Sequence, residues 1–270
     1  MSMDDETRWF RVDEPESVSL VVHGLNMKPR RMNDVVDLLQ ETRSETLRVA
    51  MTGHSKEKPS WSFVGRRHWL DDVKRGVEDG ANRAEQLCVP FHGVGYSMGG
   101  QYLVDALNET GGATDRNVLF APSIALTPEA NSQLFYAKWL GPIPTPSSLD
   151  DYYRSNSTIP GSAYGAMASS QYALETGASA AALNVPTMVL LDPNDEWISE
   201  SGIREFMARH KLTNWAMHML LRSKEAVKGR WRHLIHDRRS LGEHWEDVAN
   251  RVKHFLAQGR RSTHKAQSPL

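Results

Sequence analysis

The chain has 270 residues, of which 40% are hydrophobic, and it carries 32 basic and 33 acidic side chains. This length and composition suit a single α/β domain with a sizeable core, and the balanced charge argues against nucleic acid or an anionic membrane as the main partner. The single cysteine, Cys88, excludes an internal disulfide, and its apolar surroundings predict a buried thiol. Because the first residues are acidic, unlike a signal peptide, and no apolar run reaches membrane-spanning length, we expect a soluble, cytoplasmic protein.

Predicted strands and helices alternate along the first hundred residues. Apolar runs predict strands over 17–27, 47–54 and 87–96, and apolar residues at helical spacing predict helices over 29–42 and 69–84. This order implies a parallel sheet with right-handed crossovers. A functional site is then expected at the carboxyl ends of the strands.

A Gly-x-Ser-x-Gly pentapeptide centred on Ser97 lies where the third predicted strand meets a helix. Gly95 and Gly99 suit a tight strand-to-helix turn, because the two backbones pass close together there. The helix that follows directs its first N–H groups at the serine oxygen, so that the Met98 N–H can stabilise an oxyanion. Ser97 is therefore the candidate nucleophile. The alternative is a glycine-rich turn in which the serine only caps a helix.

A second turn, His23-Gly24, ends the first predicted strand. It can direct the Leu25 N–H into the same pocket as the Met98 N–H, and two donors from different loops would form an oxyanion hole. His23 and Gly24 are then supporting residues. The alternative for this pair is a plain turn.

Two aspartates, Asp192 and Asp195, follow a strand predicted over 187–191. A serine hydrolase needs a carboxylate that fixes the tautomer of its histidine and stabilises the imidazolium. Asp195 is the preferred acid and Asp192 the fallback. The same run of Asp, Pro and Asn also suits a simple turn.

The candidate general base lies between a strand predicted over 215–221 and the last predicted helix, over 240–257. A histidine at this position can take the proton of the serine and later return it to the leaving group. His233 is the first choice and His236 the second.

The sequence pattern changes over 124–183, after a short strand predicted over 117–123. This stretch shows no convincing strand but holds aromatic, proline-broken segments and an alanine-rich helix candidate. Such an insert suits a lid over an apolar acyl pocket, and the alternative is a variable helical decoration. We therefore divide the chain into an N-terminal segment (1–16), a core in two parts (17–123 and 184–258), a helical lid (124–183) and a basic tail (259–270) that is expected to be disordered.

Together these features resemble the α/β-hydrolase-fold serine hydrolases of the carboxylesterase and monoacylglycerol-lipase-like kind. The order nucleophile, acid, base is the order that this fold uses, and the resemblance extends over residues 17–255. It implies a mostly parallel central sheet flanked by helices, with a helical lid insertion. It also implies a triad with two oxyanion donors: Ser97, Asp195 and His233, with Leu25 and Met98.

Such a protein is expected to cleave carboxylic esters through an acyl-enzyme, with no metal and no organic cofactor. Its partner would be a small-molecule ester with an apolar acyl group, and the oligomeric state stays open. Two alternatives remain. One is a thioesterase or acyltransferase with the same triad, and the other is a non-catalytic protein that binds a hydrophobic ligand on the same fold.

Overall fold

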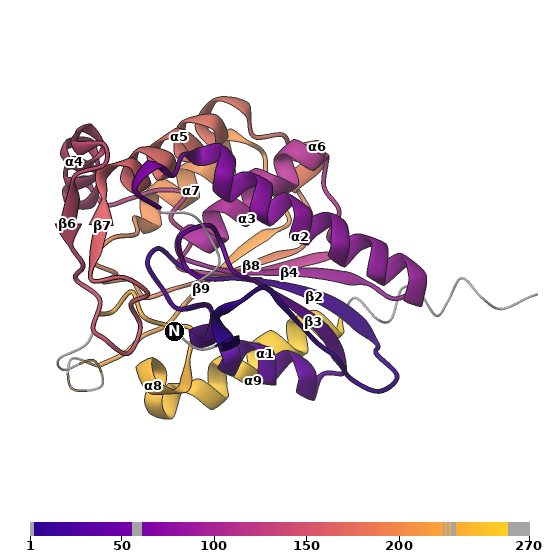
Figure 1. Ribbon diagram of the computed structural model, residues 1–270. Helices are drawn as coiled ribbons and strands as arrows, with labels where there is room; N and C mark the ends of the chain where they lie inside the picture. Colours follow the sequence, from indigo (N-terminus) through magenta and orange to yellow (C-terminus); the bar gives the residue numbers. More distant parts are fainter. Residues whose placement is uncertain (1–2, 56–60, 224, 226, 228–230, 259–270) are drawn as a thin grey trace, which may run out of the picture.

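The computed structural model, which describes residues 3–55, 61–223, 225, 227 and 231–258, is built on a seven-stranded sheet (Figure 1). The strands lie in the order β1-β3-β2-β4-β5-β8-β9. All neighbours are parallel except β1, which runs antiparallel to β3 at one edge. The strands are β1 (Arg8–Phe10), β2 (Ser17–Val22), β3 (Ser44–Val49), β4 (Phe91–Tyr96), β5 (Arg116–Phe120), β8 (Thr187–Leu191) and β9 (Trp215–Met219). The expected parallel sheet is therefore present.

Helices cover both faces of this sheet (Figure 1). On one face lie α1 (Asn33–Glu41) and α9 (Trp245–Ala257), and on the other lie α2 (Arg66–Leu87) and α3 (Met98–Thr110). Between β8 and β9 the chain forms α7 (Glu200–Arg209), and before α9 it forms α8 (Arg238–Leu241) and the 3₁₀ turn η5 (Gly242–His244). Among the described residues, no helix is long and apolar enough to cross a membrane.

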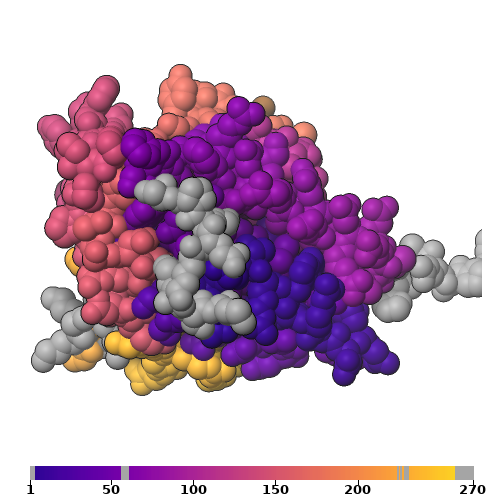
Figure 2. Space-filling model, in the orientation of Figure 1, coloured from indigo at the N-terminus to yellow at the C-terminus, as the bar shows by residue number. Residues whose placement is uncertain are grey.

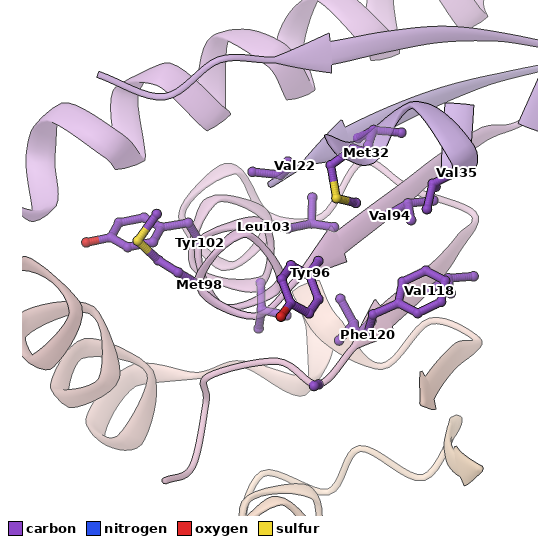
Figure 3. Packing of buried hydrophobic residues seen from close by; sticks show 14 of the residues in the cluster. Val22, Met32, Val35, Val94, Tyr96, Met98, Tyr102, Leu103, Val118 and Phe120 are labelled. Carbon is purple, nitrogen blue, oxygen red and sulfur yellow. The ribbon is translucent and has the colours of Figure 1, made fainter. Parts of the chain in front are cut away.

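Every residue of β2, β3 and β4 is buried, as expected for strands that are covered on both faces. Figure 3 shows how side chains from different layers meet in one core: Val94 comes from β4, Leu103 from α3 and Met32 from the 3₁₀ turn η2 (Pro29–Met32). This packing fixes the ends of the central strands, where the candidate site lies.

An insert joins β5 to β8, and its first part forms the pink lobe along the left edge of Figure 2. It contains α4 (Pro128–Ala137), the 3₁₀ turn η4 (Lys138–Leu140), β6 (Pro144–Pro146), β7 (Thr158–Pro160), α5 (Gly161–Gly177) and α6 (Ala180–Leu183). Its longest helix rests on α3, because the Tyr102 hydroxyl donates to the Ala166 carbonyl (2.9 Å) and the Gln101 amide to the Met167 carbonyl (2.8 Å).

The expectation that the insert contains no strand is wrong, because β6 and β7 form an antiparallel pair. Both strands have only three residues and three of the six are prolines, so that neither shows the alternation by which a strand is predicted. The division of the chain into core and lid stays a prediction, and the basic tail (259–270) lies outside the described residues.

The expectation for Cys88 is also wrong. Helix α2 continues to Leu87, and Cys88 is its C-cap, with a φ of 54° and an exposed side chain. The Cys88 N–H still bonds to the Ala84 and Glu85 carbonyls, and β4 begins only at Phe91. The apolar run over 87–96 thus includes a helix end as well as a strand.

Candidate active site

Ser97 lies in a sharp turn between β4 and α3. Its φ of 54° and ψ of −122° fall outside the regions that a side chain ordinarily allows. The neighbouring glycines have no room for a methyl group: a Cβ on Gly95 would lie 2.5 Å from the Gly100 Cα, and one on Gly99 would lie 2.3 Å from the His23 carbonyl oxygen. The glycine spacing is thus what lets this turn form.

Ser97, His233 and Asp195 form a continuous hydrogen-bonded chain, although they are far apart in the sequence. The Ser97 Oγ lies 2.8 Å from His233 Nε2, and His233 Nδ1 lies 2.9 Å from Asp195 Oδ2. The Asp195 Oδ1 accepts the N–H groups of Trp197 and Ile198, at 2.8 and 2.9 Å, which fixes the carboxylate plane. Ser97, His233 and Asp195 are all buried, and each comes after the carboxyl end of a parallel strand.

The His233 ring is held between two aromatic side chains, Tyr96 and Trp197, with ring centroids 5.2 and 4.8 Å away. The Tyr96 hydroxyl lies 3.3 Å from the His233 carbonyl and donates to it. Burial, together with the charge of Asp195, raises the pKa of Tyr96 well above its usual value, so that the hydroxyl keeps its proton.

Glu196 also holds the histidine loop, and the sequence analysis missed it. Its carboxylate accepts the N–H of His233 at 3.1 Å and the N–H of Arg232 at 2.9 Å. The only signal in the sequence is an acidic residue next to Asp195. Nothing local indicates that its partners lie more than 30 residues away.

The fallback acid, Asp192, is engaged in a different contact. Its Oδ2 lies 3.0 Å from Arg222 Nε and 3.1 Å from Arg232 Nη1, and all three side chains are largely buried. Arg222 in turn donates to the Leu234 carbonyl at 3.1 Å. Asp192 therefore ties the strand end to the loop that carries His233, while Asp195 contacts the ring.

The fallback base, His236, packs against Tyr96 and is not among the described residues that line the pocket around Ser97. Its ring packs against the Tyr96 ring at a centroid distance of 4.1 Å, and within the described residues neither ring nitrogen has a hydrogen-bond partner. Burial lowers the pKa of His236 below its usual value. The structure therefore brings His233, and not His236, to the serine.

The two expected oxyanion donors flank the serine. Met98 is the first residue of α3, and Leu25 lines the pocket above Ser97. Within the described part of the chain, neither the Leu25 N–H nor the Met98 N–H donates to a protein acceptor. Two such backbone N–H groups beside a nucleophile can donate to a negatively charged oxygen.

The two supporting residues, His23 and Gly24, hold the turn that carries Leu25. A Cβ on Gly24 would lie 2.9 Å from the Tyr96 ring, so the turn packs directly against the strand that leads to Ser97. The His23 Nε2 accepts the Met51 N–H at 3.1 Å, while Nδ1 lies 2.8 Å from the Gly24 carbonyl. The ring therefore joins the ends of β2 and β3.

A cavity of about 160 Å³ opens over Ser97 between the core and the insert. Its walls are mainly apolar, and apart from His233 the described residues that line it carry no titratable group other than tyrosine. The lining residues are Leu25, Met27, Tyr96, Ser97, Ser123, Leu126, Ala130, Gln133, Leu134, Ser148, Leu149, Ile159, Tyr164, Met167, Trp197 and His233. The Ser123 hydroxyl, which the sequence analysis did not consider, lies 3.2 Å from the Ser97 Oγ.

A family model described as "Serine aminopeptidase, S33" matches residues 13–149, just over half of the chain. The chain belongs to this family. The resemblance to α/β hydrolases is thereby confirmed, as is the fold class, and the protein is a hydrolase of the α/β-hydrolase fold. No curated protein sequence matches the chain significantly.

Several solved structures share this fold over nearly the whole chain. A soluble variant of monoglyceride lipase from Saccharomyces cerevisiae, in complex with a substrate analog, is 14% identical, with 94% of this chain and 91% of that chain covered and a TM-score of 0.75. The monoacylglycerol lipase of Paleococcus ferrophilus is 16% identical, with 94% and 99% covered and a TM-score of 0.72. MenH from S. aureus is 13% identical, with 94% and 99% covered and a TM-score of 0.61. At these identities the likeness is one of fold.

Proposed function

We propose that this protein cleaves carboxylic esters through an acyl-enzyme on Ser97. One observation carries the proposal: an unbroken hydrogen-bonded chain runs from the Ser97 Oγ through His233 to Asp195 at the base of an apolar cavity. A serine becomes nucleophilic when a base accepts its proton and a carboxylate stabilises the imidazolium that forms. The S33 family membership supports hydrolysis, and the ester bond is our inference.

The geometry suggests a role for each group. As the Ser97 Oγ attacks the ester carbonyl, its proton passes to His233 Nε2, and the tetrahedral oxyanion faces the N–H groups of Leu25 and Met98. His233 then gives the proton to the departing alcohol oxygen. Water attacks the acyl-enzyme while His233 Nε2 takes one of its protons and passes it to the Ser97 Oγ, and the carboxylic acid product leaves and loses its own proton to solvent.

The charge of the cavity wall favours esters over the peptides that the family description suggests. An aminopeptidase must bind the α-ammonium group of its substrate, and a buried ammonium needs a carboxylate partner. Among the described residues that line this cavity there is no aspartate, glutamate, lysine or arginine. An uncharged substrate with an apolar acyl group fits such a wall better.

The test compares the wild type with Ser97→Ala on p-nitrophenyl esters of increasing acyl length and on an aminoacyl p-nitroanilide. The matched control is Ser132→Ala, at an exposed serine of α4 whose hydroxyl bonds to the Pro128 carbonyl of its own helix. We expect ester turnover in the wild type and the control, and a loss of orders of magnitude in Ser97→Ala.

Three results would overturn the proposal. One is ester turnover by Ser97→Ala at the wild-type rate. Another is a folded wild type that neither hydrolyses any ester nor reacts with a fluorophosphonate at Ser97, which would favour a protein that only binds hydrophobic ligands. The third is faster cleavage of the anilide than of every ester, which would make the protein an aminopeptidase.

A further inference from the structure

The loop between β6 and β7, residues 147–157, crosses from the insert back to the core, and we call it the strap. It docks on the segment that follows β2. The Lys28 N–H donates to the Tyr153 carbonyl at 2.8 Å, the Arg31 Nε donates to the Tyr152 carbonyl at 2.7 Å, and Met27 forms a β-bridge with Arg154. Two residues of the strap, Ser148 and Leu149, line the cavity over Ser97. The strap therefore joins the cavity wall to the turn that carries Leu25.

Asn26 lies at the centre of this contact, and its side chain is fully buried. The Asn26 Nδ2 donates to the Ser147 Oγ at 2.9 Å and to the Asn156 carbonyl at 2.8 Å, and its Oδ1 accepts the Asn156 N–H at 2.9 Å. Its own carbonyl accepts the Ser155 N–H at 2.8 Å. One asparagine thus satisfies polar groups at both ends of the strap.

The same residue also fixes the backbone next to Leu25. Asn26 has a φ of 52°, in the left-handed region that asparagine and glycine tolerate best. Its N–H donates to His54 Nε2 at 2.9 Å, and the His54 ring packs against that of His23 at a centroid distance of 4.6 Å. Its N–H is held on the core side, and its carbonyl and side chain are held on the strap side, so Asn26 leaves the adjoining Leu25 peptide little freedom.

We propose that Asn26 is a positioning residue, which locks the strap onto the turn after β2 and thereby holds the Leu25 N–H where the oxyanion forms. This inference rests on the proposed ester hydrolysis. The strap then contributes to transition-state stabilisation and not only to the cavity wall. A donor acts on an oxyanion only if it is already in place, because reorganisation during the reaction would cost part of the stabilisation.

The main variant is Asn26→Gly, since glycine keeps the positive φ and removes every side-chain contact with the strap. Complete removal of one oxyanion donor lowers kcat by about 10²–10³-fold, so a displaced donor should lower it by about 10–100-fold. KM should change by less than about threefold, because the donor acts mainly in the transition state. A second variant, Ser147→Ala, removes one of the bonds between the Asn26 side chain and the strap and should give a smaller change of the same kind.

The matched control is Asn108→Ala. Asn108 on α3 also bonds to the insert, since it donates to the Gly177 carbonyl (3.2 Å) and accepts the Ser179 N–H (2.9 Å), but it does so at the far end of α5. Loss of this tether should leave kcat and KM within about twofold of the wild type.

Two further measurements separate positioning from general loosening. An alkyl trifluoromethyl ketone forms a tetrahedral adduct with the serine, and its inhibition constant should rise by the same factor as kcat/KM falls. Hydrogen-exchange mass spectrometry should show lost protection in peptides over 147–157 in Asn26→Gly, because the Ser155 and Asn156 amides lose their acceptor or its fixed position.

Retained protection of the strap in Asn26→Gly would overturn the proposal, as would lost protection with kcat within twofold of the wild type. If Asn26→Gly does not fold, the same comparison is made with Ser147→Ala. An inactive wild type would count against ester hydrolysis itself, while the exchange measurement would still report whether Asn26 holds the strap.

Discussion

Asp195 Oδ2 lies 2.9 Å from His233 Nδ1, whereas Asp192, three residues earlier on the same loop, forms ion pairs with Arg222 and Arg232. The two carboxylates are close in sequence and similarly buried, but they contact different groups. We therefore expect their replacements to separate activity from stability.

Asp195→Asn should lower kcat by about 10⁴-fold with little change in the free energy of unfolding. The amide oxygen can still accept the N–H groups of Trp197 and Ile198, but the amide nitrogen then faces His233 Nδ1 and favours the wrong tautomer. Asp192→Asn should instead destabilise the fold by about 3–5 kcal/mol, because it removes the negative charge that neutralises two largely buried guanidinium groups. Steady-state kinetics and urea unfolding of both variants test this, and a stable Asp192→Asn variant would contradict it.

We expect Glu196 to affect catalysis because its carboxylate holds the backbone of His233. Glu196→Ala removes the acceptor for two consecutive N–H groups, so the histidine loop loses its fixed position and we expect kcat to fall by about 10-fold with KM nearly unchanged. The matched control is Glu200→Ala, which breaks a surface ion pair with Arg204. Wild-type kcat in Glu196→Ala would show that Asp195 and the flanking rings hold His233 unaided.

The features predictable from the sequence are those set by neighbouring residues. The apolar run of β2 indicates a strand that is buried on both faces. The tight turn at Ser97 needs glycine at positions 95 and 99, because a side chain there would collide with neighbouring backbone atoms. The sequence places Asp195 in the loop after β8 and His233 between β9 and the last helix. Both belong to the hydrogen-bonded chain, although the sequence also allowed Asp192 and His236.

The features that could not be predicted depend on contacts between distant residues. Asn26 bonds to residues more than 120 positions away, and Glu196 to the loop after β9, so that neither shows a local pattern. The prediction that Cys88 lies in a buried strand is wrong because an apolar run does not distinguish the end of a helix from the start of a strand. In each case tertiary packing decides between local conformations that the sequence permits.

The close packing around Ser97 predicts a contrast between two glycine-to-alanine changes. Gly99→Ala would place a methyl group against the carbonyl oxygens of His23 and Val22, so we expect a destabilisation of about 3 kcal/mol and a large loss of activity. Gly177→Ala, at the end of α5, meets no atom within 4 Å and should stabilise the fold by up to about 1 kcal/mol. Thermal and urea unfolding of both variants provide the test, and equal effects would contradict the assigned packing.

The buried ring of His236 predicts how stability depends on pH. Burial lowers its pKa in the folded protein below the ordinary value of 6.5, which applies to the unfolded chain. Below pH 6.5 the unfolded chain therefore binds a proton that the folded protein does not. The contribution of His236 to the free energy of unfolding is therefore fully present above pH 6.5. It is lost as the pH falls toward the pKa of His236 in the folded protein.

We expect the free energy of unfolding of the wild type to fall, relative to that of His236→Phe, by up to about 1.4 kcal/mol per pH unit below pH 6.5. Phenylalanine keeps a flat ring against Tyr96 and removes the titrating nitrogens, neither of which has a hydrogen-bond partner among the described residues. Urea unfolding at pH 7.5, 6.5 and 5.5 measures the difference, and His254→Phe, on an exposed part of α9, is the matched control. If the free energies of unfolding of the wild type and His236→Phe changed equally with pH, protonation of the buried histidine would not destabilise the folded protein.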